Sequence, residues 1–253
     1  MKQPTIVLTE NLKEEPYASI LGYPKPVVEE LDRRVKELEK LGVEAVEFNG
    51  KTSAFNIPVL GKGYVGVVVI ARRYGQRLAL KIRRVDADRP DLLHEAAMLG
   101  KANDAGVGPA LVETSQNFLV MQLLEGDLLP IWLENHKDKT LVQQVLGEVL
   151  EQCWHLDLVG LDHGELSKAP KHVMIDAARQ PWILDFETAS DTRKPSNVTA
   201  ICQYLFMSGG AVPRMISETL GERNPKKVVD ALRLYKKEKT RESLDRLMQV
   251  LLC

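Results

Sequence analysis

Glycines between positions 61 and 68 form a pattern that can hold a phosphate group. Gly61, Gly63, Gly66 and Val68 fit the pattern G-x-G-x-x-G-x-V. In a dinucleotide-binding unit such glycines follow a strand and open a helix. Here a β-branched run and a short hairpin connection at 74–76 follow instead, which favours a glycine-rich turn whose backbone approaches phosphates closely. The alternative is a hairpin in which the glycines serve only the turn.

Lys81 lies in the next apolar run, Leu78-Ala79-Leu80-Lys81, about fifteen residues after the glycines. A lysine between apolar strand residues must extend its charge into a cleft or find a partner. Glu95, in the helix expected next, can be that partner. A Lys–Glu pair can hold phosphate oxygens. The alternatives are a lysine that extends along the surface to solvent and a solvated glutamate on a helix face.

Two further segments carry acids that could act on a phosphate or bind a metal. His163-Gly164-Glu165-Leu166 contains a histidine and a carboxylate, and Asp185 follows the apolar run Ile183-Leu184. A buried, ionised carboxylate at a strand end is costly without a cation, and Mg²⁺ is a hard ion that prefers oxygen ligands. Taken singly, Asp185 could also be a turn residue and His163 a structural core histidine.

The order and spacing of these motifs over residues 57 to 208 resemble the protein-kinase-like superfamily. The likeness is to its small atypical branch, which holds the RIO-type kinases and the small kinase of the KEOPS complex. The sequence is similar to predicted prokaryotic serine/threonine protein kinases that carry HGEL, K-H-V, D-F-E and R-K-P-S-N-V-T motifs. Those motifs stand here at His163–Leu166, Lys171–Val173, Asp185–Glu187 and Arg193–Thr199.

The resemblance implies an ATP site and a role for each motif. Backbone of the turn at Gly61, Gly63 and Gly66, with Val68 beside it, would cover the phosphates. Lys81, oriented by Glu95, would contact the α- and β-phosphates. It further implies that Asp185 binds Mg²⁺, that Glu165 orients or deprotonates the accepting hydroxyl, that His163 supports the loop, and that the connection from Gln122 to Leu124 contacts adenine.

Three departures from the kinase pattern bear on activity. Glu165 stands where kinases have Asp, which moves the carboxylate by about 1.5 Å, one C–C bond. His172 takes the place of the metal-binding Asn, and neutral imidazole suits Mn²⁺ better than Mg²⁺. Glu187 replaces the Gly of D-F-G and is interpreted as an acidic group near the metal or, equally, as a surface carboxylate. Few residues separate Asp185 from Ser196, so a long phosphorylatable activation loop is not expected.

The elements that must position these residues follow from periodicity and breakers. The order predicts an α+β, bilobal, protein-kinase-like fold: an N-terminal extension over 1–50, an antiparallel-sheet N-lobe with one helix over 51–124, and a small, mainly helical C-lobe over 125–253. Helices are predicted at 26–41, 89–103, 140–158, 225–237 and 240–252, with Ser196 capping another through Ser208; strands are predicted at 43–48, 60–73, 77–85, 110–114, 117–124, 172–175 and 181–186.

Composition is that of an ordinary globular protein. The chain has 253 residues, with 44% hydrophobic and 27% charged, and 34 Lys+Arg against 35 Asp+Glu. This balance argues against a polycation that coats nucleic acid. A local patch of arginines at 72–84 could bind RNA or an acidic partner, but it is better explained as solvent-facing charge balanced by nearby acids such as Asp86 and Asp88. The three cysteines lie far apart, and the longest apolar run, Val67 to Ala71, is far too short for a membrane span. A cytoplasmic protein is expected.

Three functions therefore remain open. The resemblance favours an ATP-dependent serine/threonine protein kinase, with Mg²⁺ or Mn²⁺ as cofactor and an unidentified hydroxyl acceptor. A small-molecule kinase, similar to aminoglycoside phosphotransferases, shares the motifs. A non-catalytic ATP-binding pseudokinase is the third, because of Glu165 and the missing Asn.

Overall fold

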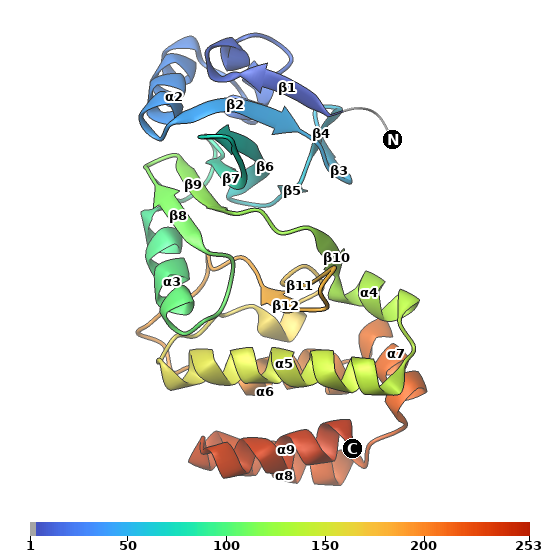
Figure 1. The fold of residues 1–253 in the computed structure, drawn as a ribbon. Coiled ribbons are helices and arrows are strands. Elements are labelled where there is room, and N and C mark those ends of the chain that lie inside the picture. The colour runs from blue at the N-terminus through green and yellow to red at the C-terminus, as the bar shows by residue number, and fades with distance from the viewer. Residues whose placement is uncertain (1–3) are drawn as a thin grey trace. The chain divides into compact units, whose positions relative to one another are not determined.

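The computed structural model describes residues 4–253, which form two compact units of an α+β protein (Figure 1). Within the described part, unit 1 takes the residues up to Ala97 together with Ala110–Leu124. Unit 2 takes Met98–Pro109 and Glu125–Cys253. Helix α3 (Leu93–Asp104) therefore begins in unit 1 and ends in unit 2.

Unit 1 is built on one antiparallel sheet with the strand order β1-β2-β6-β7-β9-β8, and β5 pairs with β6. A separate two-stranded hairpin joins β3 to β4. The strands are β1 (Thr5–Leu8), β2 (Val43–Phe48), β3 (Thr52–Ala54), β4 (Ile57–Val59), β5 (Gly61–Lys62), β6 (Gly66–Arg73), β7 (Gln76–Arg83), β8 (Leu111–Thr114) and β9 (Phe118–Gln122).

The central hairpin of this sheet is β6–β7, which the sequence predicts from its two apolar runs. Tyr74 and Gly75 make the connection, and both have left-handed backbone, with φ of 49° and 75°. A two-residue turn with positive φ at both positions matches the twist of the strands that it joins. Gln76 already belongs to β7, so the connection is one residue shorter than predicted.

Residues 1–50, set apart in the sequence analysis as an extension, contribute two strands to the sheet of unit 1; residues 1–3 lie outside the described part. The helix α2 (Val28–Lys40) lies against β2 (Figure 1). Its Arg34 is fully buried and donates to the carbonyls of Leu21 and Arg83 and to Asn117 Oδ1. A 3₁₀ turn (Thr9–Lys13) and the short α1 (Ala18–Leu21) complete this segment.

Unit 2 is mainly helical and is organised around α5 (Lys139–Leu158), which packs against α6, α7, α9 and β12 (Figure 1). Many α5 side chains are fully buried, which fits its central place. The other elements are α4 (Leu129–Asn135), α6 (Asn197–Cys202), α7 (Ala211–Leu220), α8 (Pro225–Glu238), α9 (Arg241–Leu252), a 3₁₀ turn (Leu166–Lys168), a π turn (Gln203–Met207), and the sheet β10 (Gly126–Leu128), β11 (Val173–Asp176) and β12 (Pro181–Ile183).

Local signals explain where the last helices begin, and one predicted cap is wrong. Asn224 accepts hydrogen bonds from the amides of Lys226 and Lys227 and so caps α8. Thr240 forms a capping box at the start of α9. Ser196 precedes α6 as predicted, but its side chain makes no capping hydrogen bond; it lies against Asp162 Oδ1 at 3.4 Å instead.

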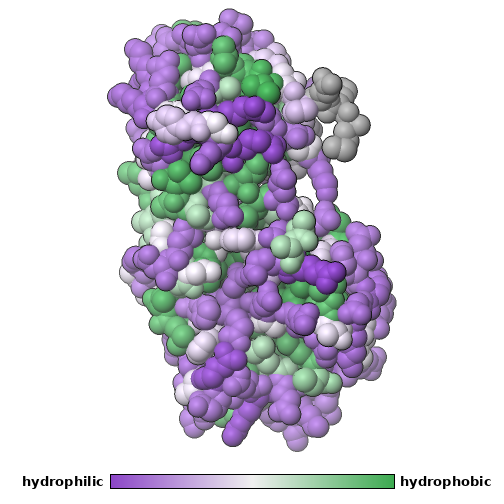
Figure 2. All heavy atoms as spheres, viewed as in Figure 1, coloured by the Kyte–Doolittle hydropathy of each residue, from purple (hydrophilic) through white to green (hydrophobic). Residues whose placement is uncertain are grey.

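Hydrophilic residues cover most of the face drawn in Figure 2, with apolar residues between them. Three of the four arginines of β6 and β7 are paired with acids of the same sheet: Arg72 and Arg77 with Glu47, and Arg73 with Glu113. The fourth, Arg83, donates to Asn117 Oδ1. Within residues 4–253, no helix has the length and apolar content that a membrane span requires.

Candidate functional site

In unit 1 the residues predicted to hold phosphates lie in one row across the sheet. Gly61 of β5 is directly opposite Val68 of β6, and Val68 is directly opposite Lys81 of β7. Residues directly opposite each other in a sheet share a face, so these three positions present one surface. Val68 is half-buried there, whereas its neighbours Val67 and Val69 are fully buried on the opposite face.

Gly66 lies on the same face and leaves room for the Lys81 side chain. A Cβ built on Gly66 would stand 2.9 Å from Lys81 Cγ and 2.8 Å from the Ile82 carbonyl oxygen. Gly63 closes the turn by donating its amide to the Gly66 carbonyl at 2.8 Å. None of Gly61, Gly63 and Gly66 has positive φ. Close approach at Gly66, rather than left-handed backbone, is therefore what requires a glycine in this turn.

Arg84 stabilises the glycine turn through hydrogen bonds to two of its carbonyl groups, a role that could not be read from the sequence. Its guanidinium donates to the Gly63 carbonyl at 3.2 Å, and its backbone amide donates to the Val65 carbonyl at 2.8 Å. Asp86 holds the same guanidinium, which also lies 5.0 Å from the ring centre of Tyr23. The neighbouring Asp86 raises the pKa of Arg84 and keeps it charged.

Lys81 and Glu95 form a buried ion pair, as the sequence analysis predicts. Lys81 Nζ lies 2.8 Å from Glu95 Oε1, and the two side chains are only 7% and 5% exposed. An ion pair this deeply buried loses most of its hydration, so its presence is weak evidence that it stabilises the fold.

In the connection predicted to contact adenine, Gln122 to Leu124, the first residue already forms hydrogen bonds within unit 1. The Gln122 amide donates to the Ala110 carbonyl at 2.8 Å, and the Gln122 side chain accepts from the Ala110 amide. The Gln122 amide is thus already used inside unit 1. Leu124 is half-buried at the end of this unit.

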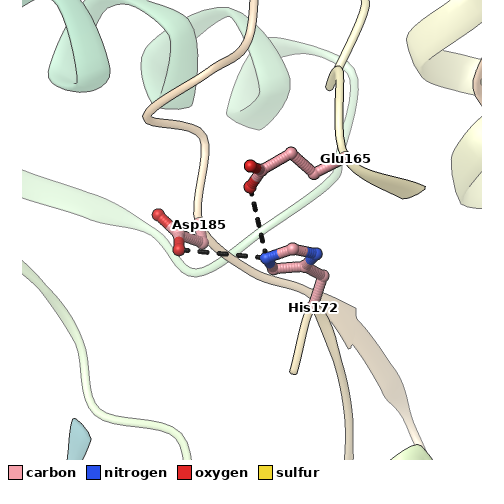
Figure 3. A group of neighbouring side chains, drawn as sticks. All are labelled: Glu165, His172 and Asp185. Carbon is pink, nitrogen blue, oxygen red and sulfur yellow. Dashed lines mark ion pairs between the residues drawn. The ribbon is translucent and has the colours of Figure 1, made fainter. Parts of the chain in front are cut away.

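In unit 2 the structure brings together Glu165, His172 and Asp185, whose side chains point toward one another (Figure 3). His172 Nε2 lies 3.4 Å from Glu165 Oε2 and 4.0 Å from Asp185 Oδ2. One oxygen or nitrogen of each residue lies within 4.8 Å of those of the other two.

Pairing of β11 with β12 brings His172 and Asp185 close together. Val173 pairs with Ile183, so the residues just outside the hairpin are opposite each other, and the Leu184 amide donates to the His172 carbonyl at 2.9 Å. Asp185 has φ of 68°, a left-handed conformation that Asp adopts more readily than most residues.

Of the two residues that follow Asp185, Phe186 is buried and Glu187 is half-buried near the cluster. The Phe186 side chain is buried against Gly108 and against the ring of His163, with ring centres 5.1 Å apart. Glu187 is half-buried, and one of its carboxylate oxygens lies within 4.8 Å of one of Asp185. The structure thus brings both residues proposed to help bind metal, His172 and Glu187, next to Asp185.

His163 is fully buried next to this cluster, with its ring centre 5.4 Å from that of His172, and it supports the loop. Its Nε2 lies 3.0 Å from the Leu184 carbonyl and donates to it, because a carbonyl oxygen can only accept. Its Nδ1 is buried without a hydrogen-bond partner among the described residues. Burial lowers the pKa of His163 to about 4, so the ring is neutral at pH 7.

Asn197, another residue that the sequence analysis did not single out, fixes the loop that carries Glu165. Its side chain accepts from the His163 amide at 2.8 Å and donates to Asp157 Oδ1 and to the Leu161 carbonyl. Tyr235 donates its hydroxyl to Asp157 at 2.9 Å, and burial raises the Tyr235 pKa, which keeps that donor in place. The available signal was the R-K-P-S-N-V-T motif, which contains Asn197.

The donor set of Asp185, His172 and Glu187 fits a divalent cation, and Glu165 lies beside it. Two carboxylates and an imidazole are hard and borderline ligands, a combination that Mn²⁺ accepts well and Mg²⁺ accepts less readily.

Comparison with protein-family models gives no match for this chain, and comparison with curated proteins gives none either.

Proposed function

We propose that this protein is an ATP-dependent phosphotransferase with a protein-kinase-like fold, which transfers the γ-phosphate of ATP to a hydroxyl group. The observation that carries the proposal is the buried Lys81–Glu95 pair, in which Lys81 shares one face of the sheet with the glycine turn. A lysine held by a glutamate beside a glycine-rich turn suits the oxygens of a nucleotide phosphate.

The acidic cluster of unit 2 supports the same chemistry. Asp185, His172 and Glu187 would hold a divalent cation, which neutralises charge on the phosphates when it is bound. Glu165 orients the accepting hydroxyl and takes its proton. The hydroxyl oxygen forms the new bond to the γ-phosphorus, the bond from that phosphorus to the β–γ bridging oxygen breaks, and ADP leaves with the electron pair.

Two acceptors are candidates. The resemblance to atypical serine/threonine protein kinases points to a side-chain hydroxyl of a protein. A small-molecule alcohol is favoured by a cavity of about 380 Å³ in unit 2, whose walls include the residues on both sides of Glu165.

ATP turnover with Mg²⁺ and with Mn²⁺ tests the proposal. We expect Asp185→Ala and Lys81→Met each to lower turnover by about 10²-fold or more, since each removes a charge that stabilises the transition state. Asp104→Ala, which removes an exposed carboxylate at the end of α3, is the matched control and should leave turnover unchanged. Equal turnover by all four proteins would refute the proposal, and nucleotide binding without turnover would leave a pseudokinase.

A further inference from the structure

Two adjoining cavities in unit 2 have a composition that points to a particular acceptor. We infer that they form the acceptor subsite of the proposed phosphotransferase, and that this subsite takes the phosphate group of a small phosphorylated alcohol. The inference rests on the proposed function for its role in transfer, but the binding that it requires can be measured without ATP.

The cavities have volumes of about 200 Å³ and about 380 Å³ and share the residues Ser196, Thr199 and Lys236. Together they fall in the size range of small-molecule sites. The segment 194–203, which leads into and forms α6, lines both, and α8 contributes the lysine that they share.

The smaller cavity is lined by three lysines, Lys194, Lys236 and Lys239. Lys239 donates to the Pro195 carbonyl at 2.6 Å and has two further N–H groups. Lys194 and Lys236 make no ion pair or hydrogen bond with any residue of the described chain. Both lysines are exposed at the rim of the cavity, so their ammonium groups can turn toward a ligand in it, and no described protein group balances their charge directly.

The two acids in the walls are already engaged and do not balance these lysines. Asp157 accepts from Asn197 and Tyr235 through its two oxygens. Asp162, in the larger cavity, is paired with Arg193 at 2.9 Å and accepts from the Ser196 amide.

A dianion matches this arrangement best. A phosphate monoester carries a charge of about −1.5 to −2 at pH 7 and has three acceptor oxygens. Lysine ammonium groups bind phosphate as point charges. A single carboxylate has a charge of −1, so it would balance the charge of one of the two lysines and leave the other without a counter-charge.

The residues that line the larger cavity indicate how a bound ligand would be oriented. Gly164, Leu166 and Ser167 line it, and these residues flank Glu165 in the loop that carries the proposed base. A ligand with its phosphate at Lys194 and Lys236 and its hydroxyl in the larger cavity would therefore present that hydroxyl to the Glu165 loop. The polar side chains of Ser167 and Gln203 in the walls suit such a hydroxylated body.

The test is a nuclear magnetic resonance titration of the full chain, without nucleotide, using inorganic phosphate and glycerol 3-phosphate as probes. We expect both probes to shift the amide signals of Ser167, Ser196 and Thr199. The double variant Lys194→Ala/Lys236→Ala should weaken both probes about tenfold or more, because two charge-assisted contacts are lost. The control Lys227→Ala/Lys237→Ala removes two exposed α8 lysines outside both cavities and should bind as wild type.

Asp185→Ala should bind both probes unchanged, so a failure of ATP turnover would not be mistaken for a failure of this subsite. Equal weakening by the two double variants, or acetate binding as tightly as phosphate, would overturn the inference. A phosphoserine peptide that binds more tightly than glycerol 3-phosphate would overturn the assignment to a small molecule.

Discussion

At the residue scale, the requirement for glycine in the turn is specific to one position. Gly66 packs against Lys81 so closely that a methyl group cannot be added without moving backbone, because the Ile82 carbonyl oxygen also lies 2.8 Å from the Cβ position. At Gly63 the nearest atom would be 3.7 Å away, an ordinary contact. The motif G-x-G-x-x-G does not distinguish these two roles.

This difference gives a prediction with a built-in control. Gly66→Ala should lower the free energy of unfolding by about 1–3 kcal/mol, the usual cost of overpacking, and should weaken ATP binding by displacing Lys81. Gly63→Ala should change stability by about 0.5 kcal/mol or less. Thermal unfolding followed by circular dichroism and titration with a fluorescent ATP analogue measure the two effects. If both variants behave alike, the packing argument at Gly66 is wrong.

At the element scale, the loop that carries Glu165 depends on a side chain from a distant helix. Asn197 begins α6, and its side chain satisfies three buried groups: the His163 amide, the Leu161 carbonyl and the Asp157 carboxylate. Since buried polar groups cost about 1–3 kcal/mol each when they lose a partner, the position of the loop and the stability of unit 2 are coupled through this residue.

Asn197→Ala should therefore lower the free energy of unfolding by about 3 kcal/mol or more. The control is Asn135→Ala, because the exposed Asn135 makes a single bond, to the Ile131 carbonyl at 3.0 Å, and should cost about 1 kcal/mol or less. Urea unfolding followed by tryptophan fluorescence reports on unit 2, which contains all three tryptophans, Trp132, Trp154 and Trp182. A loss below 1 kcal/mol for Asn197→Ala would show that the loop has other supports.

Long periodic helices and hairpins could be predicted from the sequence, because their signals are local. The prediction of a helix over 140–158 differs from α5 by one residue, and the strand over 43–48 coincides with β2. The strand β1 was missed because it is an edge strand of four residues with only Val7 buried, so it shows no alternating pattern. Pairing with β2, not its own sequence, makes it a strand.

Contacts within the site could be predicted where a charged residue requires a partner of opposite charge, but not where the partner is a backbone group. Lys81 between apolar residues demands a counter-charge, and Glu95 supplies it. Arg84 pairs with the nearby Asp86, but its support of the turn comes from the bond between its guanidinium and the Gly63 carbonyl, and a backbone acceptor leaves no signal in the sequence. The bonds of Asn197 to the His163 amide and the Leu161 carbonyl could not be predicted for the same reason.

At the scale of the whole molecule, the buried His163 links stability to pH. Burial lowers its pKa in the folded state to about 4, whereas an unfolded chain has a histidine pKa near 6.5. Between these values the unfolded state binds a proton that the folded state does not. The stabilisation is thus fully present above pH 6.5 and is lost as the pH falls toward 4, by about 1.4 kcal/mol per pH unit.

The free energy of unfolding of unit 2 should therefore fall by about 2 kcal/mol between pH 7 and pH 5 from this residue alone, a range above the titration of most carboxylates. His163→Gln is less stable at pH 7 but has no imidazole to protonate, so its stability should change less with pH over the same interval. His155→Gln, which removes an exposed histidine of α5, should keep the wild-type slope. Urea unfolding followed by tryptophan fluorescence at five pH values measures all three slopes. Parallel slopes for wild type and His163→Gln would mean that the imidazole already carries its proton in the folded protein, and the unpartnered Nδ1 would then need an acceptor.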